Sequence, residues 1–493
     1  MDGVQGSSNL DSCAMQPVPS HRRVPAELLD DIFKRATHVP GLMDVNPPHP
    51  SDMSLRDIRH NPLWDSGILS DSLRLRRSLT VVCRAWSGPA HRILHELIVI
   101  RGKIALLSLR DRSSLFPMRH LSPDKPNTFT RHVLLTGPRG GEPIVTGYRP
   151  VDGDELAVDN LASLLASLSN LQIFTVTKTF DIHLHDVFFR GLSRVCFSAL
   201  LKFDLPRIGY IPDGDTSVVS KLFSRMSGLR TLTISGNMNH DEGWCPWSVA
   251  YPPQLQSLSL LSIRCRCDPP HNPILPAIEH MSFGHYHGWP LTSACPFQTS
   301  QGSQITSLHV DLDGTGCTMK DYLTEYGDPL FEYDEPLDGS LGQILRFHPN
   351  LLQLHLILGQ ALEIEPGIEL TDLPLRLNHI SIGIHHDLYN PSKMGSGTPE
   401  EWFQRCWEWF GSRLCAVFEL LAEAIPTVSG LRVVRFLDPE ILECKAAGLR
   451  LHRPVPTGVL NAQWPFRIED RNGEALVPAR VEDGVLYFKD DLE

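Results

Sequence analysis

The sequence lacks any long hydrophobic run, and this absence is the first limit on what the chain can be. No apolar stretch approaches the roughly 20 residues that a membrane-spanning helix needs, and the first residues lack the apolar core of a signal peptide. We therefore expect a cytoplasmic or nuclear protein that does not contact a membrane.

The sequence also lacks the common catalytic motifs. It contains no P-loop, no G-x-G-x-x-G, no H-E-x-x-H, no G-x-S-x-G and no paired C-x-x-C. The 22 histidines include some beside acids, as in His385-His386-Asp387, but solvated loops account for such pairs. We expect no catalytic residue, no metal and no cofactor, and a hydrolase assembled from distant residues is the weakest alternative.

Positive charge and structural cysteines are scarce as well. The net charge of −12 argues against nucleic acid or an anionic membrane as the main partner. The 11 cysteines follow no framework spacing, which is typical of reduced thiols in a reducing compartment. With 42% hydrophobic and 21% charged residues, most of the chain should nevertheless fold.

Two amphipathic segments stand out between residues 24 and 100. The first begins with Pro25, which suits the first position of a helix. Its apolar residues recur with helical spacing and form one stripe: Leu28, Leu29, Ile32, Phe33 and Ala36. A second stripe consists of Leu75, Leu79, Val82, Cys83 and Trp86, and Pro89 can begin a third short helix.

The combination resembles the F-box, the helical module that docks a substrate receptor on the Skp-type adaptor of a cullin–RING ubiquitin ligase. The family pattern is Leu-Pro-x-Glu-Leu/Ile-Leu, then Ile-Phe, and later Val-Cys-Arg-x-Trp. Matching residues are Pro25, Glu27, Leu28, Leu29, Ile32, Phe33, Val82, Cys83, Arg84 and Trp86. The run from Ala36 to Gly41 is similar to fungal members.

Two features depart from the family. Val24 replaces the usual leucine, and residues 37–72 separate the two halves by more than the usual short turn. Five prolines make this gap an inserted loop rather than a helix, and loop length costs free energy only logarithmically. The resemblance implies an adaptor-binding surface, with its supporting core, made of Pro25, Leu28, Leu29, Ile32, Phe33, Leu79, Val82, Cys83 and Trp86.

Beyond this module the chain repeats one six-residue pattern, which we call the phrase. Its first, fourth and sixth positions are apolar, and its second, third and fifth positions vary. It begins at Leu171, Leu200, Leu229, Leu255, Ile278, Ile305, Leu351, Leu377 and Leu431, and Leu94-Leu97-Val99 also fits it. From 171 to 305 the phrases begin 23 to 29 residues apart. This spacing resembles degenerate leucine-rich repeats, whose period is 20–29 residues and whose units each supply a strand and usually a helix.

We therefore predict an α/β fold: a helical F-box followed by an irregular leucine-rich-repeat solenoid, or horseshoe. The predicted ranges are a disordered 1–22, the F-box at 23–100, the repeats at 101–440 and a C-terminal cap at 441–493. Helices are expected at 156–168 and 216–226, a capping box at Thr398 and Glu401, and a hairpin at Asp483-Gly484. An ordinary α/β domain is the competing interpretation.

The repeat also predicts a candidate surface for a protein target. Since the fourth and sixth positions face the core, the third and fifth must face the other side of the strand. Those positions are small, polar or imidazole and include His280, His309, His355 and His379. An acidic insert at 321–338 adds Glu332, Asp334 and Glu335 and favours a target with a basic patch. A solvated sheet face explains the same pattern without a target.

These features favour a substrate-recognition subunit of a Skp–cullin–F-box ubiquitin ligase, without activity of its own. Its partners would be the Skp-type adaptor, the cullin through that adaptor, and a protein substrate. The alternative is a free-standing leucine-rich-repeat scaffold that binds a partner without ubiquitin transfer.

Overall fold

The structure is a computed structural model of the 493-residue chain. It describes residues 24–39, 42–45, 67–108, 129–137, 154–177, 180, 186–205, 216–235, 249–261, 276, 278–284, 302–311, 345, 348–358, 374–384, 398, 401, 410–411, 414–415, 417–419, 421–422, 429–438, 448–450 and 457–489. The predicted disordered N-terminus, residues 1–22, lies outside these ranges.

The chain divides into two compact units. The first combines Met1–His38 with Gly67–His95, and the second combines Val39–Ser66 with Glu96–Glu493. In the part of the chain that the structure describes, no helix has the length and apolar character needed to cross a membrane.

The first unit consists of helices α1 (Ala26–Ala36), α3 (Gly67–Leu79) and α4 (Arg84–Glu96). Its small core contains Leu29, Phe33, Leu79, Ala90 and Ile93, with Trp86 packed against it. The rings of Phe33 and Trp86 meet edge to face at 5.0 Å between centroids, which is a favoured aromatic geometry. The two sequence segments thus form one small bundle.

The helix boundaries differ from the prediction in three places. Pro89, expected to begin a third short helix, lies inside α4. Helix α3 begins at Gly67, inside the predicted inserted loop 37–72. The stripe from Leu75 to Trp86 is not continuous, because α3 ends at Leu79 and α4 begins at Arg84. The Thr80 hydroxyl donates to the Arg77 carbonyl, 2.7 Å away, and satisfies one of the free carbonyls at the end of α3.

Buried polar contacts join these helices. The guanidinium of Arg76, itself buried, donates to the Ile93 carbonyl in the last turn of α4 at 2.8 Å. A positive group is favourable at this end of a helix, where carbonyls lack intrahelical partners. The Ser72 hydroxyl donates to the Thr37 carbonyl at 2.7 Å and so connects α3 to the residue that follows α1.

The second unit contains a 12-stranded sheet in the described residues, in the order β1-β2-β3-β4-β5-β6-β7-β8-β9-β10-β11-β13. All its pairings are parallel. The strands are β1 (Leu97–Arg101), β2 (His132–Thr136), β3 (Ile173–Val176), β4 (Lys202–Leu205), β5 (Thr231–Ser235), β6 (Ser257–Leu261), β7 (His280–Gly284), β8 (Ser307–Asp311), β9 (Gln353–Leu358), β10 (His379–Ile384), β11 (Val433–Phe436) and β13 (Arg467–Glu469). The α/β class is confirmed, and the strands of this sheet lie in chain order; only β12, which belongs to a separate sheet, is skipped.

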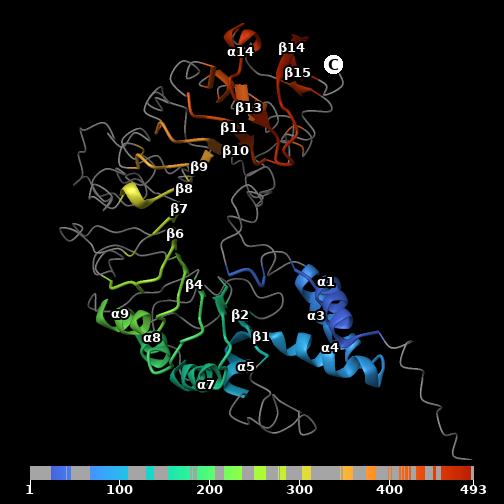
Figure 1. Cartoon of the computed structure of the whole chain (residues 1–493), viewed down its shortest axis with the longest axis vertical. Helices are drawn as coiled ribbons and strands as arrows, with labels where there is room; N and C mark the ends of the chain where they lie inside the picture. Colours follow the sequence, from blue (N-terminus) through green and yellow to red (C-terminus); the bar gives the residue numbers. More distant parts are fainter. Residues whose placement is uncertain are drawn as a thin grey trace, which may run out of the picture. The chain divides into compact units, whose positions relative to one another are not determined.

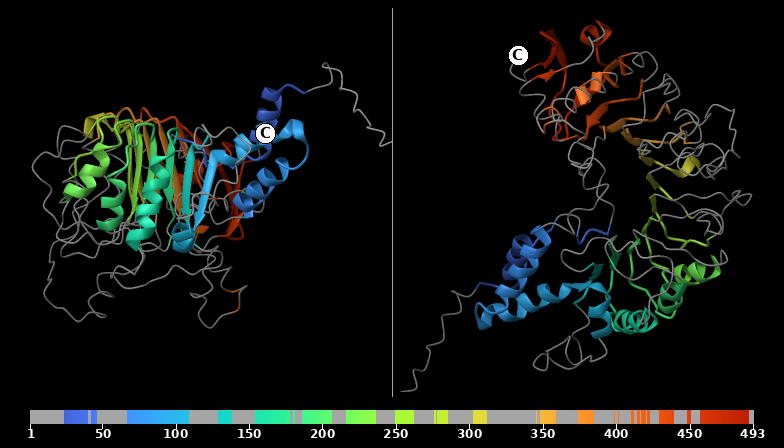
Figure 2. Two further views of the ribbon diagram at one scale, coloured as in Figure 1. Left: turned by 90° about the horizontal axis from the view of Figure 1, so that it is seen from below. Right: turned by 180° about the vertical axis from the view of Figure 1, so that it is seen from behind.

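Helices cover one face of this sheet at its N-terminal end (Figures 1 and 2). They are α5 (Gly102–Ser108), α7 (Asp154–Ala166), α8 (Asp186–Leu192) and α9 (Thr216–Ser224), and each contacts the next. The predicted helices 156–168 and 216–226 correspond to α7 and α9. Further along, a single 3-10 turn, η7 (Gly302–Gln304), precedes β8.

The fourth and sixth positions of the phrases point into the core under these helices. Residues such as Phe174, Phe203 and Leu232 are fully buried in one continuous cluster with Leu161, Phe188 and other helix residues. The Phe174 and Phe203 rings stack at 5.3 Å on adjacent strands. The alternation predicted from the repeated phrase is therefore confirmed for β3 to β6.

The phrase Leu94-Leu97-Val99 was placed in the wrong register. Leu97 pairs with His132, which pairs with Ile173, and Ile173 occupies the third position of its phrase. Ile98 and Ile100 therefore face the helix-side core, whereas Leu97 lies on the other face. The run Leu-Ile-Val-Ile is apolar on both faces, so its pattern does not fix the register.

The sheet also extends beyond residue 440, the predicted end of the repeats, because β13 pairs with β11. After it, β14 (Pro478–Glu482) and β15 (Val485–Phe488) form the predicted antiparallel hairpin, to which β12 (Leu449–Arg450) adds. Asp483 and Gly484 both have positive φ, 50° and 75°, as a two-residue hairpin turn requires. Helix α14 (Thr457–Asn461) precedes β13.

The predicted capping box is confirmed as well. The Glu401 N–H donates to the Thr398 hydroxyl at 3.3 Å, and the Thr398 N–H donates to the Glu401 carboxylate at 3.1 Å. This reciprocal pair satisfies two donors at the start of a helix.

Close packing of α7 against α8 generates a stability prediction. A Cβ atom at Gly191 would overlap the Cγ1 atom of Val158, so Gly191→Ala must push the two helices apart. We expect a loss of about 1–3 kcal/mol in the free energy of unfolding, measured by denaturant titration followed by circular dichroism. Gly88→Ala in α4 is the control, because a Cβ there meets no atom within 4 Å. Equal effects of the two substitutions would contradict the packing argument.

Candidate functional site

The sheet face that points away from α7, α8 and α9 carries the third and fifth positions of every phrase; we call it the opposite face. Strand pairing aligns these positions into two continuous rows. The third-position row is Leu97, His132, Ile173, Lys202, Thr231, Ser257, His280, Ser307, Gln353, His379, Val433 and Arg467. The fifth-position row is Val99, Leu134, Thr175, Asp204, Thr233, Ser259, Ser282, His309, His355, Ser381, Arg435 and Glu469.

Three of the four histidines singled out in the sequence come together on β8, β9 and β10. His309 and His355 are direct partners on adjacent strands, and the rings of His355 and His379 are 6.1 Å apart. His309 and His355 are buried, whereas His379 is partly exposed and its Nε2 lies 3.0 Å from the Ser381 hydroxyl. His280 is on β7, in the other row from His309.

The acidic residues predicted to accompany them, Glu332, Asp334 and Glu335, lie outside the described residues. Their contribution to a target surface therefore stays a prediction.

Sequence reasoning missed a polar network on β2, β3 and β4. The Nε2 of His132 lies 3.2 Å from the Thr175 hydroxyl, which donates to Asp204 Oδ2, also at 3.2 Å. The ammonium of Lys202 lies 3.7 Å from the same carboxylate oxygen. One hydroxyl thus joins a fully buried imidazole to a carboxylate paired with a cation.

The sequence contains the repeat that positions this network, but one substitution makes the repeat hard to recognise. The phrase before β2 has Thr130 where other phrases have an apolar residue, so the repeat at β2 could not be recognised. Thr130 is nevertheless buried like those apolar residues. Recognising this substitution would have placed His132 in the third-position row.

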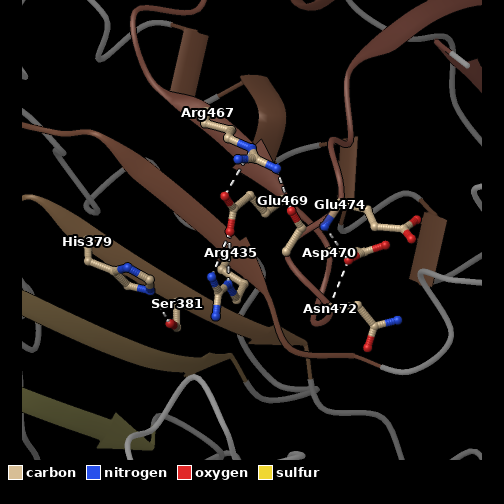
Figure 3. A network of polar contacts seen from close by, with 9 residues as sticks. His379, Ser381, Arg435, Arg467, Glu469, Asp470, Asn472 and Glu474 are labelled. Carbon is tan, nitrogen blue, oxygen red and sulfur yellow. Dashed lines mark hydrogen bonds and ion pairs between the residues drawn. The ribbon is translucent and has the colours of Figure 1, made fainter. Parts of the chain in front are cut away.

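A second polar network lies at the other end of the opposite face (Figure 3). The carboxylate of Glu469 accepts hydrogen bonds from Arg435, at 2.8 and 3.1 Å, and forms an ion pair with Arg467, at 3.0 Å. Asp470 Oδ1 accepts from the N–H groups of Asn472 and Glu474 and so fixes the turn that follows β13. One carboxylate at this end of the face thus pairs with two guanidinium groups.

In the first unit, the nine residues predicted for the adaptor surface separate into two groups. Leu29, Phe33 and Leu79 are buried, and Trp86 is half-buried against Phe33. The others are exposed: Pro25, Leu28, Ile32, Val82 and Cys83. Val24, Leu28 and Ile32 are each more than half exposed, at 52%, 54% and 53%, and follow one another at intervals of four on and beside α1.

Sequence reasoning overlooked two further exposed apolar residues of this unit. Val81 is 82% exposed in the turn between α3 and α4, beside Val82 at 55%, and Ile68 is 52% exposed in the first turn of α3. An apolar side chain in a turn gives no periodic signal, so the sequence pattern could not mark Val81 as part of a surface.

Two side chains away from these surfaces have shifted pKa values. Burial, aided by Glu419, raises the pKa of the Cys415 thiol to about 12, so it stays protonated near neutral pH. Burial and then the nearby His91 lower the pKa of His95. Within the described ranges, no group of three or more His, Cys, Asp or Glu side chains is arranged to hold a metal ion.

Comparison with the models of known protein families gave no match, and comparison with curated proteins gave none either.

The network on β2, β3 and β4 generates a stability prediction. Thr175→Val removes the hydroxyl between His132 and Asp204 and with it both hydrogen bonds of that hydroxyl, so we expect a loss of about 1–3 kcal/mol in the free energy of unfolding. The control is Thr233→Val, in the same row on β5, because the described residues show no hydrogen bond of the Thr233 side chain. Denaturant titration of both variants measures the difference, and a similar loss in both would refute a special role for Thr175.

Proposed function

We propose that this protein is the substrate-recognition subunit of a Skp–cullin–F-box ubiquitin ligase. The observation that carries the proposal is the division of the motif residues of the first unit into a buried set and an exposed set. Motif residues that resemble the F-box include a buried set, which holds three helices together, and an exposed apolar set on α1 and in the turn before α4.

The exposed set has the geometry of a helix-binding surface. Val24, Leu28 and Ile32 form a single stripe, and burying each such side chain against a partner contributes roughly 1.5–3 kcal/mol when burial is complete. Apolar anchors at intervals of four are the usual contacts of an amphipathic helix with a partner. A Skp-type adaptor is the partner that the sequence resemblance implies.

The second unit supports the other half of the proposal, an irregular leucine-rich-repeat solenoid that serves as a spacer and a target-binding surface. Its strands follow the chain order and each repeat contacts the next, as in solenoid proteins. A receptor of this kind needs no catalytic group, because holding the target near a ubiquitin-charged enzyme raises the effective concentration of the reacting groups.

The target surface that we propose is the polar part of the opposite face, from β5 to β10. The partly exposed serine and histidine side chains there supply hydrogen-bond donors and acceptors without long flexible stems; they are Ser259, His280, Ser282 and His379. His280 and His379 are partly exposed and accessible to a partner. The acidic insert 321–338 favours a target with a basic patch.

The adaptor surface can be tested with one double variant. In Leu28→Ala with Ile32→Ala, both side chains are exposed, so folding should be unchanged. Capture of the adaptor should fall at least tenfold, since central interface residues each contribute about 1–2 kcal/mol or more. The control is Ile104→Ala with Leu156→Ala, which changes two exposed apolar residues of the second unit. The proposal fails if the first variant still binds the adaptor with the affinity of the wild type.

Cysteine labelling provides an internal check on the same interface. Cys83 and Cys196 are exposed, and Cys415 is buried with a raised pKa. Bound adaptor should protect Cys83 from iodoacetamide at pH 8 and leave the labelling of Cys196 unchanged. Cys415 should react only after unfolding, because the thiolate is the reactive form.

Two alternatives make different predictions in the same experiments. A free-standing repeat scaffold would capture neither the adaptor nor a cullin from cell extract. A hydrolase would turn over a generic ester substrate, which the proposed receptor would not.

The target surface can be tested independently of the adaptor. In His280→Ala with His379→Ala, two partly exposed imidazoles are removed from the proposed surface. Quantitative mass spectrometry of co-purified proteins should show loss of target proteins but normal recovery of the adaptor. The Leu28→Ala, Ile32→Ala variant should show the reverse. Identical sets of partners for both variants would exclude this face as the target site.

A further inference from the structure

The first unit exposes more large apolar side chains than it buries. Among its described residues the exposed ones are Val24, Leu28, Ile32, Ile68, Leu75, Val81 and Val82. The buried ones are Leu29, Phe33, Leu69, Leu79 and Ile93. None of the buried residues belongs to the core cluster of the second unit. Because apolar burial is the main favourable term in folding, the core of this unit stabilises it only weakly.

The helices of this unit are also weak on their own. Helices α1, α3 and α4 have 11, 13 and 13 residues, and isolated helices shorter than about 12–15 residues are marginal in water. Helix α4 contains Gly88 and Pro89, the two residue types that disfavour a helix interior most. Pro25, which precedes α1, makes no side-chain capping hydrogen bond. The helices therefore depend on packing against one another.

The contacts that hold the unit together each join two different helices. Phe33 of α1 meets Trp86 of α4 edge to face, and Arg76 of α3 donates to the Ile93 carbonyl of α4. If one helix unfolds, the other two lose these partners. The three helices should therefore open and close together, as one cooperative unit.

The second unit is built in the opposite way. Strands β5 and β6 each pair with a neighbour on both edges, so their backbone hydrogen bonds belong to a continuous ladder. Leu232 and Leu258 in these strands are fully buried in a core cluster that extends from Ile100 to Phe488. Opening β5 or β6 requires breaking contacts on both sides, whereas opening the first unit requires the loss of one small core.

We propose that the first unit opens and closes in the free protein while the sheet stays folded, and that a partner which covers its exposed apolar set holds it closed. The inference rests on the proposed function in one respect, namely that this partner is the Skp-type adaptor. A ligand that binds only the folded state of a unit stabilises that state by mass action. Adaptor binding and folding of the helical unit are then thermodynamically linked.

Hydrogen exchange of the full chain, followed by mass spectrometry, tests the independent opening. The amides of α1, α3 and α4 should exchange at least about a hundredfold faster than those of β5 and β6, because the exchange rate follows the population of the open state. Equal protection of the helices and these strands would overturn the proposal. This measurement needs no variant and no adaptor.

Two substitutions test whether the helices open together. Phe33→Ala removes the ring contact with Trp86 and should abolish the remaining protection of all three helices. Gly88→Ala places a helix-favouring residue where a Cβ meets no atom within 4 Å. It should slow exchange in all three helices about two- to fivefold. The proposal is wrong if either substitution affects only one helix, or if Phe33→Ala also removes the protection of β5 and β6.

Purified Skp-type adaptor at a saturating concentration tests the linkage. It should slow exchange in α1, α3 and α4 at least tenfold and leave β5 and β6 unchanged. Leu28→Ala with Ile32→Ala should keep the exchange pattern of the free chain and lose this effect of the adaptor. Bound adaptor that protects α1 alone would overturn the linkage. Absence of binding would instead contradict the ubiquitin-ligase proposal, and the free chain would still decide whether the unit opens independently.

Discussion

One backbone carbonyl just before most strands fixes the register of the sheet. The carbonyl that precedes the third position of a phrase accepts two N–H groups from the next strand. The Thr306 carbonyl, for example, accepts from Leu352 at 2.8 Å and Gln353 at 3.0 Å. The same double contact recurs at the carbonyls of Arg131, Gln172, Leu201, Arg230, Gln256, Glu279, Leu352 and Asn378. A shift of one residue would break these two hydrogen bonds and move every side chain of the strand to the other face of the sheet. The register of each strand is therefore fixed by that of its neighbour.

This constraint gives the two faces of the sheet different requirements on residue type. The fourth and sixth positions must be apolar, because they pack under the helices in a single cluster. The third and fifth positions carry no such requirement, and their composition can vary along the rows. That freedom accounts for apolar residues at β1–β3, histidines at β8–β10 and an arginine–glutamate network at β11 and β13 on one continuous face.

The sequence predicted the α/β class, the strands with an intact phrase and the two polar rows, because a strict period of two leaves little ambiguity. It failed where one residue departs from the phrase. Strand β2 was not recognised because Thr130 occupies an apolar position, and β13 was not recognised because Asp470 occupies the sixth position. At β1 the run is apolar on both faces, and the predicted register was wrong by one residue. It also could not separate the buried from the exposed motif residues of the first unit. Leu28 and Leu29 are adjacent and chemically identical, and only the positions of α3 and α4 determine which one packs inward.

The start of the insertion bears on how the first unit can be built from two separated segments. Contact between Phe33 and Trp86 closes a loop that includes the whole insertion, and the closure cost depends on how much of that loop is free. Val39 and Leu42 are buried and belong to the second unit, so the insertion is restrained close to the end of α1, at Ala36. The chain passes from one unit to the other between His38 and Val39, between Ser66 and Gly67, and between His95 and Glu96. The residues already fixed at the start of the insertion therefore do not add to the entropy cost of closing that loop.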